Sequence, residues 1–139
     1  MEYKRFNSVL AVRLNKGEEI TGALLKLIEK EKLTAGSISG IGATDDFCVG
    51  VFDLQTKCYK RFEYSGNHEI VSLCGNISAM NGAPYLHLHI SCADADGRMV
   101  GGHLLSAKIS LTAEILIHIA EGSIERRRDE ELGINLWEF

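Results

Sequence analysis

Residues 85–104 of the chain are YLHLHISCADADGRMVGGHL, and this stretch predicts a β-hairpin. Alternate residues of a strand point to the same face, so His87 and His89 project together while the intervening leucine points to the other side. Residues 94–98, Asp-Ala-Asp-Gly-Arg, are a strong turn signal. Gly97 suits the left-handed residue that closes a three-residue hairpin loop with a bulge. One face of this hairpin is therefore apolar and the other carries imidazoles.

The register of the hairpin decides whether a third histidine joins the first two. If residues 95–97 form the loop, Asp94 lies opposite Arg98, and counting back along both strands places His89 opposite His103. Directly opposed residues have Cβ atoms about 4.5–5.5 Å apart, which allows two imidazoles to share one metal ion. A loop one residue shorter or longer would turn His103 away.

Two interpretations of these histidines stay open at this point. The first is a metal site formed by His87, His89 and His103, with zinc as the favoured divalent ion and nickel, copper or iron as alternatives. Three protein ligands leave one coordination position open, which is typical of a catalytic or ligand-binding metal site. The second is a set of solvated or hydrogen-bonded histidines without an ion.

The length of 139 residues predicts one domain covering residues 1–139, and the hydrophobic content of 45% is that of a globular protein. The sequence shows no signal-peptide hydrophobic region and no apolar run of about 18 residues, so we expect a cytoplasmic protein without a membrane span. The four cysteines form no C-x-x-C pair. They are expected to be buried, reduced thiols. They are Cys48, Cys58, Cys74 and Cys92.

The charge distribution argues against direct nucleic-acid binding. The formal net charge is −4, whereas a nucleic-acid binder needs a basic face to neutralise phosphates. The one basic run, Arg126–Arg128, is followed directly by Asp129, Glu130 and Glu131. We expect this segment to be a solvated surface turn or a group of local ion pairs.

One long helix is expected from about Lys16 to Lys32, after a first strand from Phe6 to Leu14. Asn15 is the expected N-cap, with Glu18 as its capping-box partner. Apolar residues recur at helical spacing and should form the stripe that packs on a sheet. They are Ile20, Leu24, Leu27 and Ile28.

The rest of the chain is typical of short strands separated by turns, which with one helix predicts a largely antiparallel α+β domain. Such strands would curl into an open barrel or a sandwich. The glycines of residues 40–45 lack the third glycine and the helix of a dinucleotide site. The expected strands are Gly36–Ile41, Phe47–Asp53, Lys57–Tyr64, Glu69–Met80, Tyr85–Ala93, Met99–Leu105 and Ile109–Ala120.

The segment from Leu111 to Ile119 is heavily apolar. It is expected to be a strand that is buried on both faces or lies at a subunit interface. A trimer buried there should break when Leu111 or Ile115 is replaced by Asp. On this interpretation His118 is a structural histidine with a satisfied hydrogen bond.

Several segments together resemble the plants-and-prokaryotes-conserved (PPC) domain family over nearly the whole chain. Singly these motifs are weak, but their order and spacing are specific. They are Ile38–Ala43, Glu69–Ser78, Leu86–His89, Ala93–Gly97, Gly101–Leu104 and Thr112–Ile115.

The resemblance implies a strongly bent, mostly antiparallel sheet with one principal helix, assembled as a homotrimer. It also implies that the prokaryotic histidine cluster corresponds to His87, His89 and His103 in this chain, and that the fold is similar to acetolactate decarboxylase. Plant members bind DNA through a separate AT-hook, which this sequence lacks. Stand-alone prokaryotic members are commonly labelled as DNA-binding.

Two functions follow as hypotheses. One is a metal-dependent site for a small-molecule ligand, with Tyr85, Asn76 and Arg98 as expected ligand contacts. Lyase-like catalysis rests on fold analogy alone, and its candidate proton-transfer groups are Glu69 and Glu114. The other is a DNA-binding or regulatory assembly module in which the metal is structural or absent.

Overall fold

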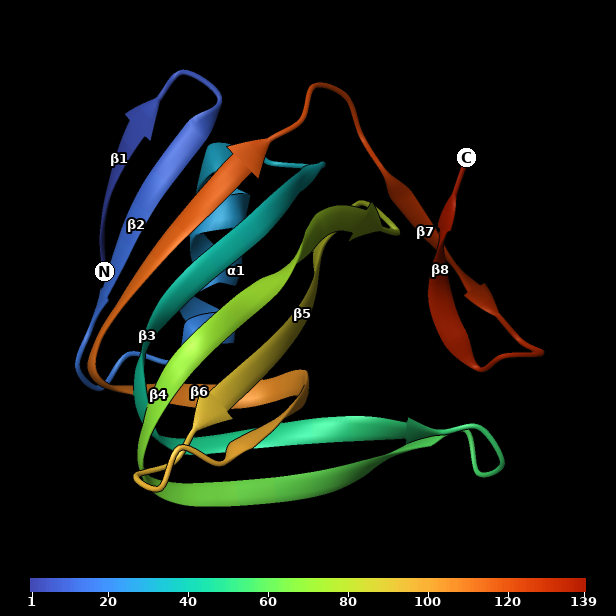
Figure 1. The fold of residues 1–139 in the computed structure, drawn as a ribbon. Coiled ribbons are helices and arrows are strands. Elements are labelled where there is room, and N and C mark those ends of the chain that lie inside the picture. Colours follow the sequence, from blue (N-terminus) through green and yellow to red (C-terminus); the bar gives the residue numbers. More distant parts are fainter.

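One strongly curved, mostly antiparallel β-sheet organises the chain, and a single helix lies against one of its faces (Figure 1). The computed structural model describes residues 1–139. The strand order is β1-β2-β6-β3-β4-β7-β8, and β5 pairs with both β4 and β6, so the sheet is partly closed. The α+β expectation is confirmed. The elements are β1 (Glu2–Phe6), β2 (Val9–Asn15), α1 (Ile20–Glu31), β3 (Gly36–Asp53), β4 (Cys58–Met80), β5 (Ala83–Ala93), β6 (Met99–Ile119), β7 (Glu125–Asp129) and β8 (Ile134–Glu138).

The expected short strands merge into three long bent strands, β3, β4 and β6, which corrects their predicted boundaries. Bulges explain the difference, because an extra residue bends a strand without ending its pairing. The β3–β4 register shifts between Gly40 and Gly42 and again between Thr44 and Asp46. At the second shift the buried Thr44 hydroxyl donates to the carbonyl oxygen of Lys108 at 2.7 Å. The polar residues 44–46, where the sequence predicted a break between two strands, therefore mark a bend within one continuous strand.

Helix α1 covers the inner face of the sheet with the stripe expected from the sequence. All four stripe residues are buried and belong to the same hydrophobic core as the inward residues of β2, β3 and β6. Ile115 is one of those core residues, with 1% of its surface exposed. Its replacement by Asp would disrupt the core, so it does not test a subunit interface as expected.

The N-terminus of the helix differs from the prediction. The helix begins at Ile20, and Glu19 is the N-cap, with a side chain that accepts from the backbone N–H groups of Thr21 and Gly22. The residues before the helix pair with β6 instead. The N–H of Gly17 donates to the Ile109 carbonyl, and the N–H of Ile109 donates to the Glu18 carbonyl. A backbone engaged in this pairing cannot also be helical.

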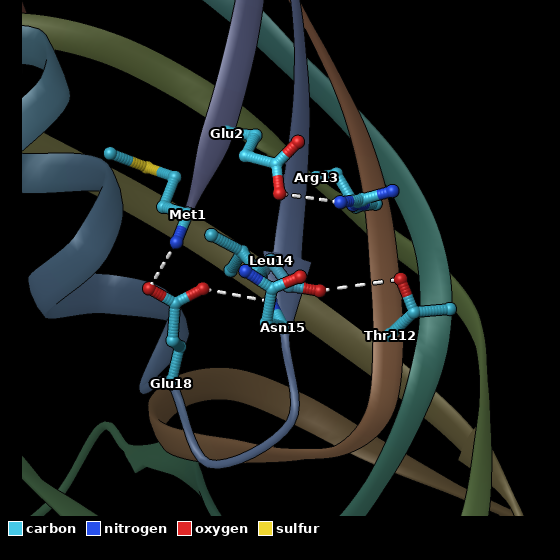
Figure 2. A network of polar contacts seen from close by, with 7 residues as sticks. All are labelled: Met1, Glu2, Arg13, Leu14, Asn15, Glu18 and Thr112. Atoms are coloured by element: carbon cyan, nitrogen blue, oxygen red, sulfur yellow. Dashed lines mark hydrogen bonds and ion pairs between the residues drawn. The ribbon is translucent and has the colours of Figure 1, made fainter.

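The bond expected for a capping box, from the backbone N–H of Asn15 to the Glu18 side chain, is present although neither residue belongs to the helix. Glu18 accepts from the backbone N–H of Asn15 at 2.7 Å and pairs with the amine of Met1 (Figure 2). These contacts hold the pKa of Glu18 below its ordinary value, chiefly through the Asn15 bond. Nearby, Thr112 of β6 donates to the Leu14 carbonyl, so the end of β2, where the chain leads to the helix, is tied to the neighbouring strand β6 (Figure 2).

The first strand is also divided differently from the prediction. Phe6 ends β1, and the chain turns at Asn7, which has a positive φ of 51°, before β2 starts at Val9. Asn tolerates this left-handed conformation better than most residues do. The two strands then form an antiparallel pair that extends from Glu2–Arg13 to Phe6–Val9.

The apolar strand from Leu111 to Ile119 is buried on one face only. Ala113, Ile115 and Ile117 point into the core, whereas Leu111 and Leu116 are exposed. His118 lies on the exposed face and its side chain makes no hydrogen bond, which corrects its expected structural role. From Ala113 onward the alternation follows from the pleat of a strand that has the core on one side, whereas Leu111 is exposed where β6 shifts register against β3, between Ile109 and Ala113.

The cysteines are all free thiols, and two of the four are buried as expected. Burial raises the pKa of Cys92 to about 11, which keeps it protonated and unreactive. Cys58 and Cys74 are exposed, contrary to expectation. No helix has the length and apolar character that a membrane span requires.

Candidate metal centre

The β5–β6 hairpin has the register that the sequence predicts. His89 pairs directly with His103, and Ala93 pairs with Met99 next to the turn. The loop closes through the N–H of Asp94, which donates to the Arg98 carbonyl at 3.0 Å. Gly97 has a positive φ of 75°, as a three-residue loop requires.

The three histidines converge from this hairpin. His87, His89 and His103 each offer a ring nitrogen, and these atoms lie within 4.8 Å of one another. The Nε2 atoms of His87 and His89 are 3.3 Å apart. Two nitrogens on a tetrahedral zinc ion with bonds of about 2.0–2.1 Å are separated by about 3.3–3.4 Å. The arrangement therefore matches two positions of a zinc site closely.

The environment of the histidines also fits a metal ion. Burial, with the two neighbouring imidazoles, lowers the pKa of His103 to about 4, and burial lowers the pKa of His87 as well. These two rings are thus neutral at pH 7, the form that binds metals. The Nδ1 atom of His103 is buried without any hydrogen-bond partner. A buried ring nitrogen without a partner is unusual, and a ligand at this cluster would relieve it.

An aromatic ring holds His103 in place from outside the hairpin. Tyr59, from the start of β4, stacks on the His103 imidazole with ring centroids 4.7 Å apart and an interplanar angle of 25°. Gly50 of β3 pairs with His103 and leaves the space that Tyr59 occupies, because a Cβ at Gly50 would lie 2.7 Å from the Tyr59 ring. The site thus depends on contacts between distant strands.

A cavity of about 270 Å³ opens beside the histidines. His87 and His103 line it together with three aromatic residues, Phe52, Tyr59 and Tyr85. The β7–β8 hairpin closes the far side and contributes Arg126 and Arg128, and Lys57 lies at the β3–β4 tip. No acidic residue lines this cavity.

One of the three expected ligand contacts, Tyr85, lines this cavity, and a second, Asn76, lies behind it in contact with the lining residue Arg126. The Tyr85 hydroxyl accepts from the side-chain amide of Asn135 at 3.3 Å. Asn76 pairs with His87 across β4 and β5 and accepts from Arg126 at 2.9 Å. Arg98 instead lies at the hairpin turn, exposed, where it pairs with Asp96 at 3.1 Å.

The candidate proton-transfer groups do not face the histidines within one chain. Glu69 and Glu114 are both exposed and line a separate groove on the outer face of β3, β4 and β6. Glu114 lies opposite Arg13 and Ile41. A catalytic role for either glutamate stays a prediction.

Sequence reasoning missed the most unusual residue of the cavity wall, Arg126. The run 126–128 is not a turn but lies in β7, and Arg126 is only 8% exposed. Its neighbour Arg127 does form an exposed ion pair, with Glu138 of β8. Alternation in residues 134–138, after the turn glycine Gly133, is the signal that predicts such a hairpin.

Comparison with known proteins gives a consistent family. Residues 1–121 match the model of the Plants and Prokaryotes Conserved (PCC) domain, whose abbreviation is also written PPC. A curated relative, the "Bifunctional protein GlmU" of Synechococcus sp., is 32% identical over 111 residues. That match covers 78% of this chain but only 17% of the relative.

Solved structures match over almost the whole chain. A "putative DNA binding protein" from Bacteroides thetaiotaomicron has 35% identity and a TM-score of 0.97, with 99% of this chain and 96% of that chain covered. A "metal-containing protein" from Archaeoglobus fulgidus has 30% identity and a TM-score of 0.87, covering 99% and 97%. A Staphylococcus aureus protein described as similar to alpha-acetolactate decarboxylase shares the fold at 16% identity and a TM-score of 0.56, covering 83% and 53%.

Proposed function

The chain belongs to the Plants and Prokaryotes Conserved domain family, and from this premise we propose that it is a homotrimeric protein that binds a small molecule at a three-histidine zinc site. The observation that carries the proposal is the convergence of three ring nitrogens within 4.8 Å on a hairpin of the predicted register. The solved relative from Archaeoglobus fulgidus is described as a "metal-containing protein".

The residues around the histidines would each have a distinct part in such a site. His87, His89 and His103 would hold the ion, and Tyr59 would fix the orientation of the His103 ring by stacking on it. Zinc would supply Lewis acidity at its open position. Tyr85 lines the adjoining cavity, and its hydroxyl, which accepts from Asn135, keeps its own O–H to donate to a bound molecule.

The first experiment measures the zinc content of purified protein by plasma mass spectrometry. We expect about one equivalent per chain in the wild type and a large loss in His89→Ala and His103→Ala. His68→Ala is the matched control, since the His68 ring bonds the Gly66 carbonyl and does not belong to the cluster. A folded wild-type protein that retains no zinc after zinc is added back would overturn the proposal.

The outer face of the sheet is the proposed interface between the subunits of the trimer. This face exposes Ile41, Val71, Leu111 and Leu116, with exposed fractions of 58%, 51%, 71% and 44%. Large apolar side chains gathered on one face are typical of an interaction surface. The face also continues to the metal site, because Leu116, Ser39, Cys74 and His89 follow one another across paired strands. Neighbouring copies would thus lie beside the histidines.

Light scattering tests the assembly. Leu116→Asp should convert trimers to monomers, because it places a charge in the centre of the proposed interface. Leu54→Asp is the control, since Leu54 is 78% exposed at the β3–β4 tip, outside this face. A trimeric mass for a folded Leu116→Asp protein would place the interface elsewhere.

DNA binding is the second candidate function, favoured by the description of the Bacteroides relative. The net charge of −4 opposes it. Direct binding would appear in fluorescence anisotropy with a duplex at low salt and would weaken steeply as salt rises. The zinc-site proposal expects no such binding, and a salt-dependent complex would favour the DNA-binding module instead.

A further inference from the structure

A buried cation without an anionic partner lies in the wall of the cavity beside the histidines. The guanidinium of Arg126 donates to the Ser78 hydroxyl at 2.7 Å, the Asn135 carbonyl at 2.7 Å and the Asn76 amide oxygen at 2.9 Å. All three acceptors are neutral, and Arg126 forms no salt bridge. Buried charges in proteins are usually paired, so this arrangement calls for an explanation.

The guanidinium keeps donors free for a ligand. Three of the five N–H groups of an arginine are used by these bonds, which leaves two. The central carbon of the guanidinium lies over two aromatic rings, 4.7 Å from the Tyr85 centroid and 5.8 Å from the Trp137 centroid. Stacking and hydrogen bonds orient the fork, and an oriented guanidinium recognises carboxylates and phosphates through paired N–H groups.

The other charges around the cavity have the same sign. Arg128 and Lys57 also line it, without any carboxylate among the lining residues. The Lys57 ammonium donates to the Glu130 carbonyl at 3.2 Å, which joins the β3–β4 tip to the β7–β8 turn over the cavity. In a chain of net charge −4, three cations around one cavity form a local site for negative charge.

The positive charge lies next to the histidine cluster, because Arg126, His87 and His103 line the same cavity. A divalent ion held by the histidines would add further positive charge there, so an anion in this cavity would be attracted by both.

We propose that the cavity between the three histidines and the β7–β8 hairpin binds a small organic oxyanion, a carboxylate or a phosphate, whose charged group is held by Arg126 and Arg128. The inference deepens the proposed function, since it names the class of ligand of the same site. The aromatic wall of Phe52, Tyr59 and Tyr85 favours a flat or apolar body next to the anionic group. The volume of about 270 Å³ limits the ligand to a small metabolite.

Isothermal titration calorimetry with benzoate and phenyl phosphate tests the proposal, with benzamide as the neutral counterpart of benzoate. At least one anion should bind the zinc-loaded wild-type protein, while benzamide should bind at least about tenfold more weakly. Comparison of benzoate with phenyl phosphate decides between carboxylate and phosphate. Fluorescence of Trp137, the single tryptophan, gives a second readout at the Arg126 side of the site.

Single variants test whether the anion is bound by Arg126 and Arg128 themselves or only attracted by the general positive charge of the cavity. Arg126→Met should weaken anion binding at least about tenfold, because it removes the buried charged donors. Arg128→Met should weaken it about threefold and will fold, since Arg128 is exposed. Arg127→Met is the matched control, because its side chain pairs with Glu138 and does not line the cavity. Equal affinity of wild type, Arg126→Met and Arg128→Met would overturn the proposal.

The same titration in His89→Ala protein separates this inference from the zinc proposal. If the arginines bind the anion, binding persists without zinc, weakened by the loss of the metal–ligand bond. If the wild-type protein holds no zinc but still binds the anion in a way that depends on Arg126, only the metal proposal is rejected. Absence of anion binding to folded, zinc-loaded wild-type protein at millimolar anion would reject the anion site only.

Discussion

The two hairpins that form the candidate site are attached to the protein in different ways. The β5–β6 hairpin is paired on both sides, with β4 along β5 and with β3 along β6. The β7–β8 hairpin joins the sheet at a single bridge, between Ala79 and Glu125, and stands apart in Figure 1. The histidines therefore belong to a rigid part of the sheet, whereas the cationic wall is held by a few bonds, chiefly those of Arg126 to β4 and the bond from Lys57 to the Glu130 carbonyl.

This difference separates two requirements of a binding site. Metal ligands need fixed spacing, because coordination distances vary by only about 0.2 Å. A wall that closes on a ligand can be less firmly held, since elements with few contacts open at low free-energy cost. The predictions below weaken each hairpin in turn.

The largest effect is expected from Gly75→Ala, which disrupts the pairing of β4 with β5 next to the histidines. A Cβ at Gly75 would lie 2.0 Å from the backbone oxygen of His87, so β4 and β5 must separate. We expect a loss of about 3 kcal/mol in the free energy of unfolding, measured by urea denaturation, together with reduced zinc content. Ser72→Ala, on the exposed face of the same strand, is the control. A stable Gly75→Ala protein with full zinc content would contradict the rigid-platform view.

The second effect is local and concerns the β7–β8 hairpin. Arg126→Met removes the bonds to Ser78 and Asn76 that attach β7 to β4. Hydrogen bonds to charged groups contribute about 1.5–3 kcal/mol each, so amides of β7 and β8 should exchange at least about tenfold faster with deuterium. Exchange in β5 and β6 should stay unchanged. Arg127→Met should leave both hairpins protected, since its ion pair is exposed. If Arg126→Met left exchange in β7 and β8 as slow as in the wild type, other contacts would be holding the hairpin.

The same contrast explains what the sequence could predict. The β5–β6 hairpin was predictable to the residue because its signals are local, namely the alternation around His87 and the turn at Gly97. The role of Arg126 was not, since its partners Ser78 and Asn76 lie 48 and 50 residues away in the sequence. Charge alone made the run 126–128 look solvated.

Long-range pairing also explains the errors in the strand boundaries. Local polar segments such as residues 44–46 interrupt the apolar pattern, and the prediction ended strands there. In the structure the backbone stays paired through bulges, and the Thr44 hydroxyl is satisfied by Lys108 of another strand. No local pattern distinguishes such a bend from a turn, whereas the α1 stripe needed only helical periodicity.

The smallest effect concerns the turn that sets the histidine register. The Asp94 carboxylate accepts from the backbone N–H groups of Arg98 and Asp96, both at 2.9 Å. These bonds, first the one from Arg98, hold the pKa of Asp94 below its ordinary value. The stabilisation is therefore present above the unfolded pKa of about 3.9 and is lost as pH falls through the lower folded pKa.

Asp94→Asn should consequently lower the melting temperature at pH 7, and the difference from wild type should be smaller at pH 3, because the stabilisation by the ionised carboxylate declines as the pH falls below the unfolded pKa of about 3.9. Asp96→Asn is the control, because the Asp96 ion pair with Arg98 is exposed and contributes little. Melting curves at both pH values provide the measurement. A difference that stayed constant with pH would show that the amide disturbs the loop by geometry and that the charge of Asp94 has no part in fixing the turn. If the loop controls the position of His103 opposite His89, the Asp94→Asn protein should also contain less zinc than the wild type at pH 7.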